Sequence, residues 1–200
     1  LTNDHGALLI FDEVITGFRV AWGGAQALYG VTPDMTCLGK IVGGGMPLAA
    51  YGGRREVMEG VAPLGPMYQA GTLSGNPVAV AAGIATVKAL QIRGTYEKLE
   101  ETSAQLERGL RDVLRRARRN AALNRVGSVM TLFFNDGPVT TWADVARSDT
   151  KAYADFFHGM LDRGVYLAPS AFEAAFVSAV HVERDIDETV AAARQALTSL

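Results

Sequence analysis

The sequence predicts an α/β protein in two parts. Residues 1–95 form a mostly parallel sheet with helices, and residues 96–200 form a smaller α+β domain. Three observations predict this division. Residues 7–11 are a continuous apolar run of the kind found in buried parallel strands. Residues 1–83 hold 16 of the 22 glycines and 10 charged residues. Residues 84–200 hold the other 30 charged residues, as expected of solvated amphipathic elements.

Composition narrows the class of protein. A hydrophobic content of 48% favours a packed core over disorder. A net charge of -2 gives no indication of a basic surface that would bind nucleic acid or an anionic membrane. No apolar run is long enough for a membrane span. We expect a cytoplasmic enzyme or binding domain, with a small molecule as its partner. Because the chain starts at Leu1 rather than at methionine, we expect the front of a longer protein to precede it.

Several kinds of site are not predicted. Cys37 is the only cysteine, so there is no disulfide framework and no cysteine metal cage. The three histidines share no metal-ligand spacing, and no Ser-His-Asp arrangement or nucleophile elbow is present. The arginines of residues 115–119 lack an aromatic stacking platform, so they are interpreted as a solvated helix end.

The elements of the first part follow from the patterns of apolar residues and turn residues. A central strand over residues 7–11 ends at Asp12-Glu13, and a second strand covers residues 35–38 after Thr32-Pro33-Asp34. The remaining predictions are a strand over 48–51, a short helix over 54–58, a loop over 60–69 and a helix over 77–90. The last helix is apolar almost all round, so we expect it to be buried.

The second part is predicted to begin with an amphipathic helix from Thr95. It continues with a strand over 129–134, a helix over 150–162, strands over 165–167 and 176–180, and a closing helix over 187–197. After its first helix this domain therefore has a βαββα order.

Asp12 is the first chemical candidate. Ligands of α/β sheets bind off the carboxyl ends of strands, where Asp12 is predicted to lie. A carboxylate there needs a partner, and one suitable partner is a protonated ring nitrogen of a ligand. Two alternatives remain open at this point: Asp12 caps the next helix, or it pairs with Arg19.

Lys40 is the second candidate. It follows the apolar run of residues 35–38 and precedes the glycine triplet of residues 43–45, so we expect little solvent around its amine. Desolvation lowers the pKa of an amine, and a neutral amine attacks carbonyls. Lys40 is thus predicted to hold pyridoxal 5′-phosphate (PLP) as a Schiff base. The alternative is an ordinary lysine with its head in water.

The stretch Gly71–Pro77 is the third candidate. It combines small residues and two hydroxyls with the start of the helix over 77–90, and backbone amides and hydroxyls at such a place bind phosphate well. Pro77 suits the first helical turn. A plain N-terminal helix cap is the alternative.

Residues 11–19, 38–47 and 68–77 together resemble the class-III PLP-dependent aminotransferases of fold type I. The resemblance runs over nearly all 200 residues. It implies that Lys40 binds PLP covalently and moves a proton between substrate and cofactor carbons. It further implies that Asp12 pairs with the pyridine nitrogen and that Val14 packs on one ring face. Gly71 and Thr72 would grip the phosphate across the interface of a homodimer with shared active sites.

Ile15 and residues 166–173 are most similar to one branch of this family, the glutamate-1-semialdehyde aminomutases. That branch implies an isomerase that starts from the pyridoxamine form and makes 5-aminolevulinate, the tetrapyrrole precursor, from one substrate. Glu173 is its candidate substrate residue; alternatively, Pro169, Ser170 and Phe172 only turn and pack the small domain.

The same resemblance implies that the chain is a C-terminal half, which is inactive alone because much of the pocket is absent. Two other functions remain open. One is a class-III ω-aminotransferase with a separate amino donor and acceptor, and the other is an inactive fragment.

Overall fold

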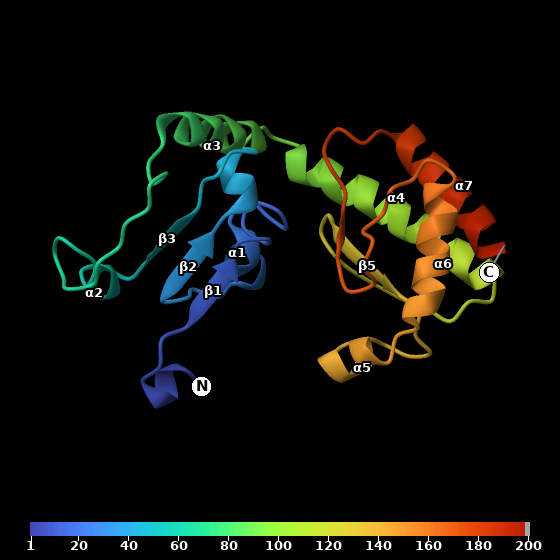
Figure 1. The fold of residues 1–200 in the computed structure, drawn as a ribbon, viewed down its shortest axis with the longest axis horizontal. Coiled ribbons are helices and arrows are strands. Elements are labelled where there is room, and N and C mark those ends of the chain that lie inside the picture. The colour runs from blue at the N-terminus through green and yellow to red at the C-terminus, as the bar shows by residue number, and fades with distance from the viewer. Residues whose placement is uncertain (199–200) are drawn as a thin grey trace. The chain divides into compact units, whose positions relative to one another are not determined.

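The computed structural model describes residues 1–198, which form two compact units: Leu1–Tyr96 and a second that begins at Glu97. Figure 1 shows the first unit in blue to green and the second in yellow-green to red. In chain order the first unit contains η1 (Asn3–His5), β1 (Ile10–Glu13), α1 (Gly24–Tyr29), β2 (Met35–Leu38), η2 (Lys40–Gly43), β3 (Ala50–Gly53), α2 (Arg55–Met58) and α3 (Pro77–Leu90). The assignment of residues 1–95 to the cofactor-binding domain of a longer enzyme stays a prediction.

The first unit is built on a three-stranded sheet in the order β1-β2-β3. β1 and β2 are parallel, with Ile10 opposite Met35 and Glu13 opposite Leu38, whereas β2 and β3 are antiparallel. The predicted α/β class is confirmed. The prediction that the first strand is central and buried on both faces is wrong, because β1 is an edge strand and Ile10 is 54% exposed.

Two other predictions for this unit need correction. β3 lies two residues later than the predicted strand over 48–51. The helix over 77–90 forms as predicted but is not buried: Val78 and Ile84 are more than half exposed. The reason is that α3 packs on η2 through one face only, where Ala79 and Gly83 are buried (Figure 1).

The second unit consists of helices packed on the second sheet, which is antiparallel throughout and has the order β4-β5-β6. Its buried core includes Phe156, Met160 and Ala193, each at most 2% exposed. The elements are α4 (Thr95–Arg116), which begins in the last residues of the first unit, β4 (Ala122–Val126), β5 (Val129–Phe133), α5 (Trp142–Ala146), α6 (Thr150–Leu161), β6 (Ala175–Phe176) and α7 (Glu183–Thr198).

The predicted order βαββα is wrong for this unit. A strand over 122–126, which was not predicted, pairs with β5 as a hairpin closed by Val126 and Val129. Residues 165–167 form no strand, since Val165 and Leu167 pack against the core without a ladder partner. The strand predicted over 176–180 is reduced to the two-residue β6. No helix of the described residues is long and apolar enough to span a membrane.

Candidate active site

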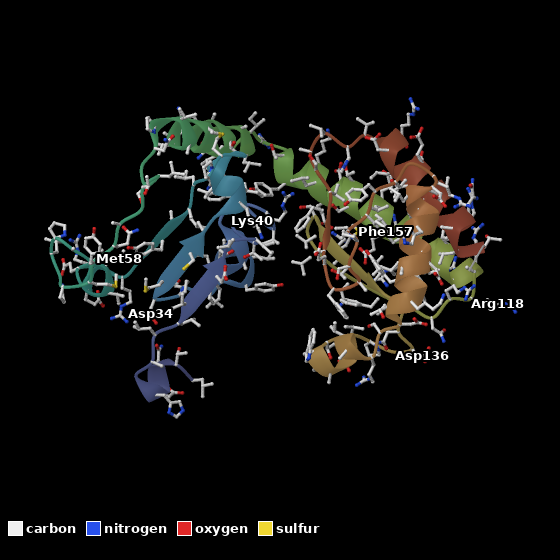
Figure 2. The ribbon with its side chains drawn as sticks, viewed as in Figure 1. Asp34, Lys40, Met58, Arg118, Asp136 and Phe157 are labelled. Atoms are coloured by element: carbon white, nitrogen blue, oxygen red, sulfur yellow. The ribbon has the colours of Figure 1, made fainter. Side chains whose placement is uncertain are left out.

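The carboxyl ends of β1 and β2 lie at the same edge of the sheet because the two strands are parallel. Asp12 lies opposite Cys37 in this register, and Lys40 follows two residues after the end of β2. Figure 2 marks Lys40 beyond one end of β2 and Asp34 at the other. The structure therefore brings the two predicted catalytic residues to one edge, which is where α/β sheets bind ligands.

Lys40 has an unusual backbone. Its φ of 50° lies in the left-handed region, which is costly for a residue other than glycine and is often found at functional sites. Among residues 1–198, no hydrogen bond or ion pair involves its amine. The side chain is exposed, so the expectation of scarce solvent is wrong for this chain.

Asp12 is also exposed and available. Its Oδ1 accepts a hydrogen bond of 3.0 Å from the backbone N–H of Val14, and none of the described cations pairs with the carboxylate. The alternative pairing with Arg19 is therefore not seen. Nor does Asp12 cap the next helix. Its carboxylate is left with acceptor capacity for a protonated ring nitrogen.

Glu13 carries the helix-capping role that sequence left open for Asp12. It is only 1% exposed, and its carboxylate accepts hydrogen bonds from the N–H groups of Ala25 and Gln26, in the first turn of α1, and from the Thr16 hydroxyl. Burial raises the pKa of the Glu13 carboxyl, but these hydrogen bonds outweigh it and hold that pKa below its ordinary value. Sequence reasoning missed this residue.

A cavity of about 650 Å³ lies on the sheet face that Asp12 shares with Cys37. It is lined by Val14, Cys37 and Tyr51 from the sheet and by Gly71 from the loop before α3. This volume is in the range of small-molecule sites. Two of the predicted cofactor residues, Val14 and Gly71, thus share one cavity.

Thr72 lies in the turn of residues 71–76, where Ser74 N–H donates to Gly71 O at 2.9 Å. The N-terminal cap of α3 is Asn76, whose Oδ1 accepts from Val78 and Ala79. The cap that was the alternative role for this stretch is therefore made by Asn76. The exposed Thr72 hydroxyl has no partner among the described residues and is available to a ligand.

Glu173 belongs to the second unit. Its backbone N–H donates to Ser170 O at 3.2 Å in a tight turn, and its exposed side chain borders a cavity of about 480 Å³ that Tyr166 and His181 also line. Burial raises the pKa of the nearby Tyr153, and the charge of Glu173 raises it further. A substrate role for Glu173 stays a prediction.

These residues fit PLP chemically. The cofactor needs an amine for its aldehyde, an anion for its ring nitrogen, an apolar side chain for its ring and donors for its phosphate. Lys40, Asp12, Val14 and Thr72 supply these in that order, and the first, second and last have no competing charged partner among residues 1–198. No group of three His, Cys, Asp or Glu side chains in that range could hold a metal ion.

Comparison with known proteins identifies the family of this chain. A family model described as aminotransferase class-III matches residues 1–197. The chain belongs to the class-III aminotransferase family. The family resemblance of the three sequence stretches is thereby confirmed. Curated relatives include glutamate-1-semialdehyde 2,1-aminomutases of Desulforudis audaxviator, 57% identical, and of Pelotomaculum thermopropionicum, 59% identical, each over 98% of this chain. The chain spans about 45% of the length of each.

Two solved structures share the fold of this chain. An ω-transaminase from Sphaerobacter thermophilus matches with a TM-score of 0.86 and 30% identity, over 98% of this chain and 45% of the other. A glutamate-1-semialdehyde aminomutase from Pseudomonas aeruginosa, in complex with PMP, matches with a TM-score of 0.87 and 25% identity, over 100% and 46%.

Proposed function

We propose that this chain is the C-terminal part of a PLP-dependent glutamate-1-semialdehyde 2,1-aminomutase, which makes 5-aminolevulinate for tetrapyrrole synthesis. The observation that carries the proposal is the 57–59% identity to aminomutases over 98% of the chain. The location of Asp12 and Lys40 at one sheet edge supports it, because the reaction needs an amine and a ring-nitrogen partner on the same ligand.

Bound PLP supplies an electron sink for the substrate carbanion. Residues of this chain bind and orient the cofactor. Lys40 provides the amine that binds the aldehyde and, when free, accepts and returns the proton at the two reacting carbons. Asp12 keeps the pyridine nitrogen protonated, Val14 contacts one ring face, and Thr72 with the Gly71 N–H binds the phosphate. Glu173 is proposed as a substrate contact.

The exposed amine of Lys40 supports a further part of the proposal. A catalytic amine of this kind is desolvated during the reaction. The protein segments that shield the Lys40 amine from solvent are therefore assigned to parts outside these 200 residues. We assign them to the remaining 55% or so of an aminomutase of the relatives' length and to a second copy in a homodimer with shared active sites. A cytoplasmic location completes the proposal.

The alternative function is that of an ω-aminotransferase with a separate amino donor and acceptor. It is favoured by one observation, the 30% identity and TM-score of 0.86 to the Sphaerobacter thermophilus ω-transaminase. The higher identity to aminomutases favours the first function.

The test uses the longest natural chain that contains these residues, loaded with PLP or its amine form. Glutamate-1-semialdehyde is supplied as the only substrate. The aminomutase converts it to 5-aminolevulinate without any keto acid. Formation of product only after an amino acceptor and donor are added would instead establish the aminotransferase. Lys40→Ala serves as the inactive control.

A further inference from the structure

Glu13 lies between the two proposed active-site residues Asp12 and Val14, but its side chain is on the other face of the sheet. Side chains alternate along a strand, so the Asp12 side chain lies on the face of Cys37, a lining residue of the cavity, and the Glu13 side chain lies on the opposite face. On that far face Glu13 is 1% exposed. A buried carboxylate is tolerated only when it is fully hydrogen-bonded, which makes its surroundings rigid.

The hydrogen bonds of Glu13 reach three parts of the first unit. Oε2 accepts from Thr16 Oγ1 and from Ala25 N, both at 2.7 Å, while Oε1 accepts from Gln26 N at 2.9 Å and Gln26 Nε2 at 3.2 Å. The backbone takes part as well, since Glu13 O accepts from Gly17 N at 2.9 Å. One side chain therefore ties the end of β1 to the following turn and to α1.

Gln26 extends this network to the neighbouring strand. Its Nε2 also donates to Thr36 Oγ1 of β2 at 3.3 Å, and Thr36 lies four residues before Lys40. In the parallel register Thr36 is opposite Phe11, next to Asp12. The network Glu13–Gln26–Thr36 thus joins β1, which carries Asp12, to β2, the strand that precedes Lys40, on the face opposite Cys37.

The chain leaves room for this network at Gly24. A Cβ at that position would stand 2.3 Å from Glu13 Oε2, and its φ of 70° is in the region that favours glycine. The first turn of α1 can close on the carboxylate only because this side chain is missing.

We propose that Glu13, linked through Gln26 to Thr36, is a positioning residue that fixes the separation and orientation of Asp12 and Lys40 toward the cofactor. This inference rests on the proposed PLP function of the site and deepens it. Glu13 contacts neither cofactor nor substrate. Its carboxylate fixes the end of β1 to α1 directly, and the Gln26 side chain extends this restraint to β2, so that the ring-nitrogen partner and the amine meet one ligand in the right geometry.

The principal test is Glu13→Gln in the longest natural chain. Glutamine keeps the size of the side chain but turns one acceptor into a donor that faces the N–H of Ala25 or Gln26. The matched control is Glu107→Gln in the second unit, where a partly buried carboxylate loses its ion pairs to Arg125 and Arg111. Both variants are expected to lower the Tm.

Only Glu13→Gln is expected to alter the binding and the environment of the cofactor. We expect the Kd for PLP to rise about tenfold or more, the visible circular dichroism of bound cofactor to change, and kcat to fall while KM stays within about twofold. Glu107→Gln is expected to leave all three at their wild-type values. If Glu13→Gln loses Tm but keeps wild-type PLP affinity and circular dichroism, its role is purely structural and the proposal is overturned.

A milder pair keeps the test decisive if Glu13→Gln does not fold. Thr36→Val removes the oxygen that Gln26 reaches, whereas Thr36→Ser retains it. The valine variant is expected to weaken PLP binding several-fold and the serine variant to restore it; equal affinities would overturn the inference. If the wild-type protein itself binds no PLP, the proposed function fails and the inference with it. If wild type binds PLP and these variants bind equally, the inference alone fails.

Discussion

Gly39, the residue before Lys40, lies directly against Val14. A Cβ built on Gly39 would meet Cγ1 of Val14 at 3.2 Å, which is tighter than an ordinary van der Waals contact. The backbone of Gly39 is extended, with φ at -162°, so its conformation alone would admit any residue. The contact with Val14 is what restricts this position, and it joins the two segments of the proposed site.

We therefore predict that Gly39→Ala displaces Val14 by a few tenths of an ångström and weakens PLP binding. The cost of such overpacking is about 1 kcal/mol, or roughly a fivefold rise in the Kd for PLP. A spectroscopic titration of the apo form of the longest natural chain measures it. The control is Gly52→Ala, because a Cβ at Gly52 would meet nothing within 4 Å. Equal affinities of the two variants would contradict the proposed contact of Val14 with the cofactor.

Gly24 and Gly30 separate steric overlap from backbone strain. Both have positive φ, at 70° and 65°, but a Cβ at Gly24 would overlap Glu13 whereas one at Gly30 would meet nothing within 4 Å. Alanine at either position costs about 1–2 kcal/mol for the left-handed backbone. Gly24→Ala is expected to lose about a further 2 kcal/mol. Unfolding in urea measures both, and equal losses would show that the carboxylate of Glu13 is not held where the structure has it.

Arg125 joins α4 to the β4-β5 hairpin through two carboxylates. It pairs with Glu107 at 2.6 Å and with Glu100 at 2.8 Å. Burial raises the pKa of Glu107, but the hydrogen bonds of Arg125 and Arg111 outweigh it, so the Glu107 pKa lies below its ordinary value. The hydrogen bond of Arg125 likewise lowers the pKa of Glu100.

A lowered folded-state pKa gives stability that is present above the unfolded pKa, about 4.3 for glutamate, and is lost as the pH falls through the folded value. We predict that the free energy of unfolding declines as the pH falls below about 4.3. Glu107→Gln should reduce that decline by on the order of 1 kcal/mol. Urea unfolding at a series of pH values from neutral to acid checks this. An unchanged slope in the variant would mean that the ion pairs of Glu107 contribute nothing.

The chain by itself should bind PLP weakly. The described residues leave Lys40 and Asp12 exposed, and ligand pockets normally bury most of their ligand. We expect a purified chain of these 200 residues to show no stoichiometric PLP binding. Joining it to the N-terminal part of the Desulforudis audaxviator aminomutase, in place of the matching segment, should restore binding. Tight binding by the 200 residues alone would refute the view that the cover comes from elsewhere.

Local sequence patterns predicted the elements that carry the site. The apolar run before Lys40 and the proline at the start of α3 were sufficient to find β2 and that helix, because strand pattern and helix start are local properties. The missed strand β4 also had a local signal. Gly127-Ser128 between valines is typical of a two-residue hairpin loop, and its Val126–Val129 closing pair is what the structure contains.

Burial could not be predicted in the same way. The exposure of Ile10, Val78 and Lys40 depends on which other segments pack on them, and an apolar pattern states only that some partner is expected. The role of Glu13 was missed for a related reason. Two adjacent acids differ in function because alternate strand residues point to opposite faces, and only the register shows which acid lies on the face of Cys37.

The central claim is the covalent bond between Lys40 and PLP. The longest natural chain is incubated with PLP and treated with borohydride, which reduces the bond to a stable secondary amine, and its peptides are mapped by mass spectrometry. The account predicts one pyridoxyl group per chain, on Lys40. A label on Lys88, Lys98 or Lys151 instead, or no label at all, would contradict it.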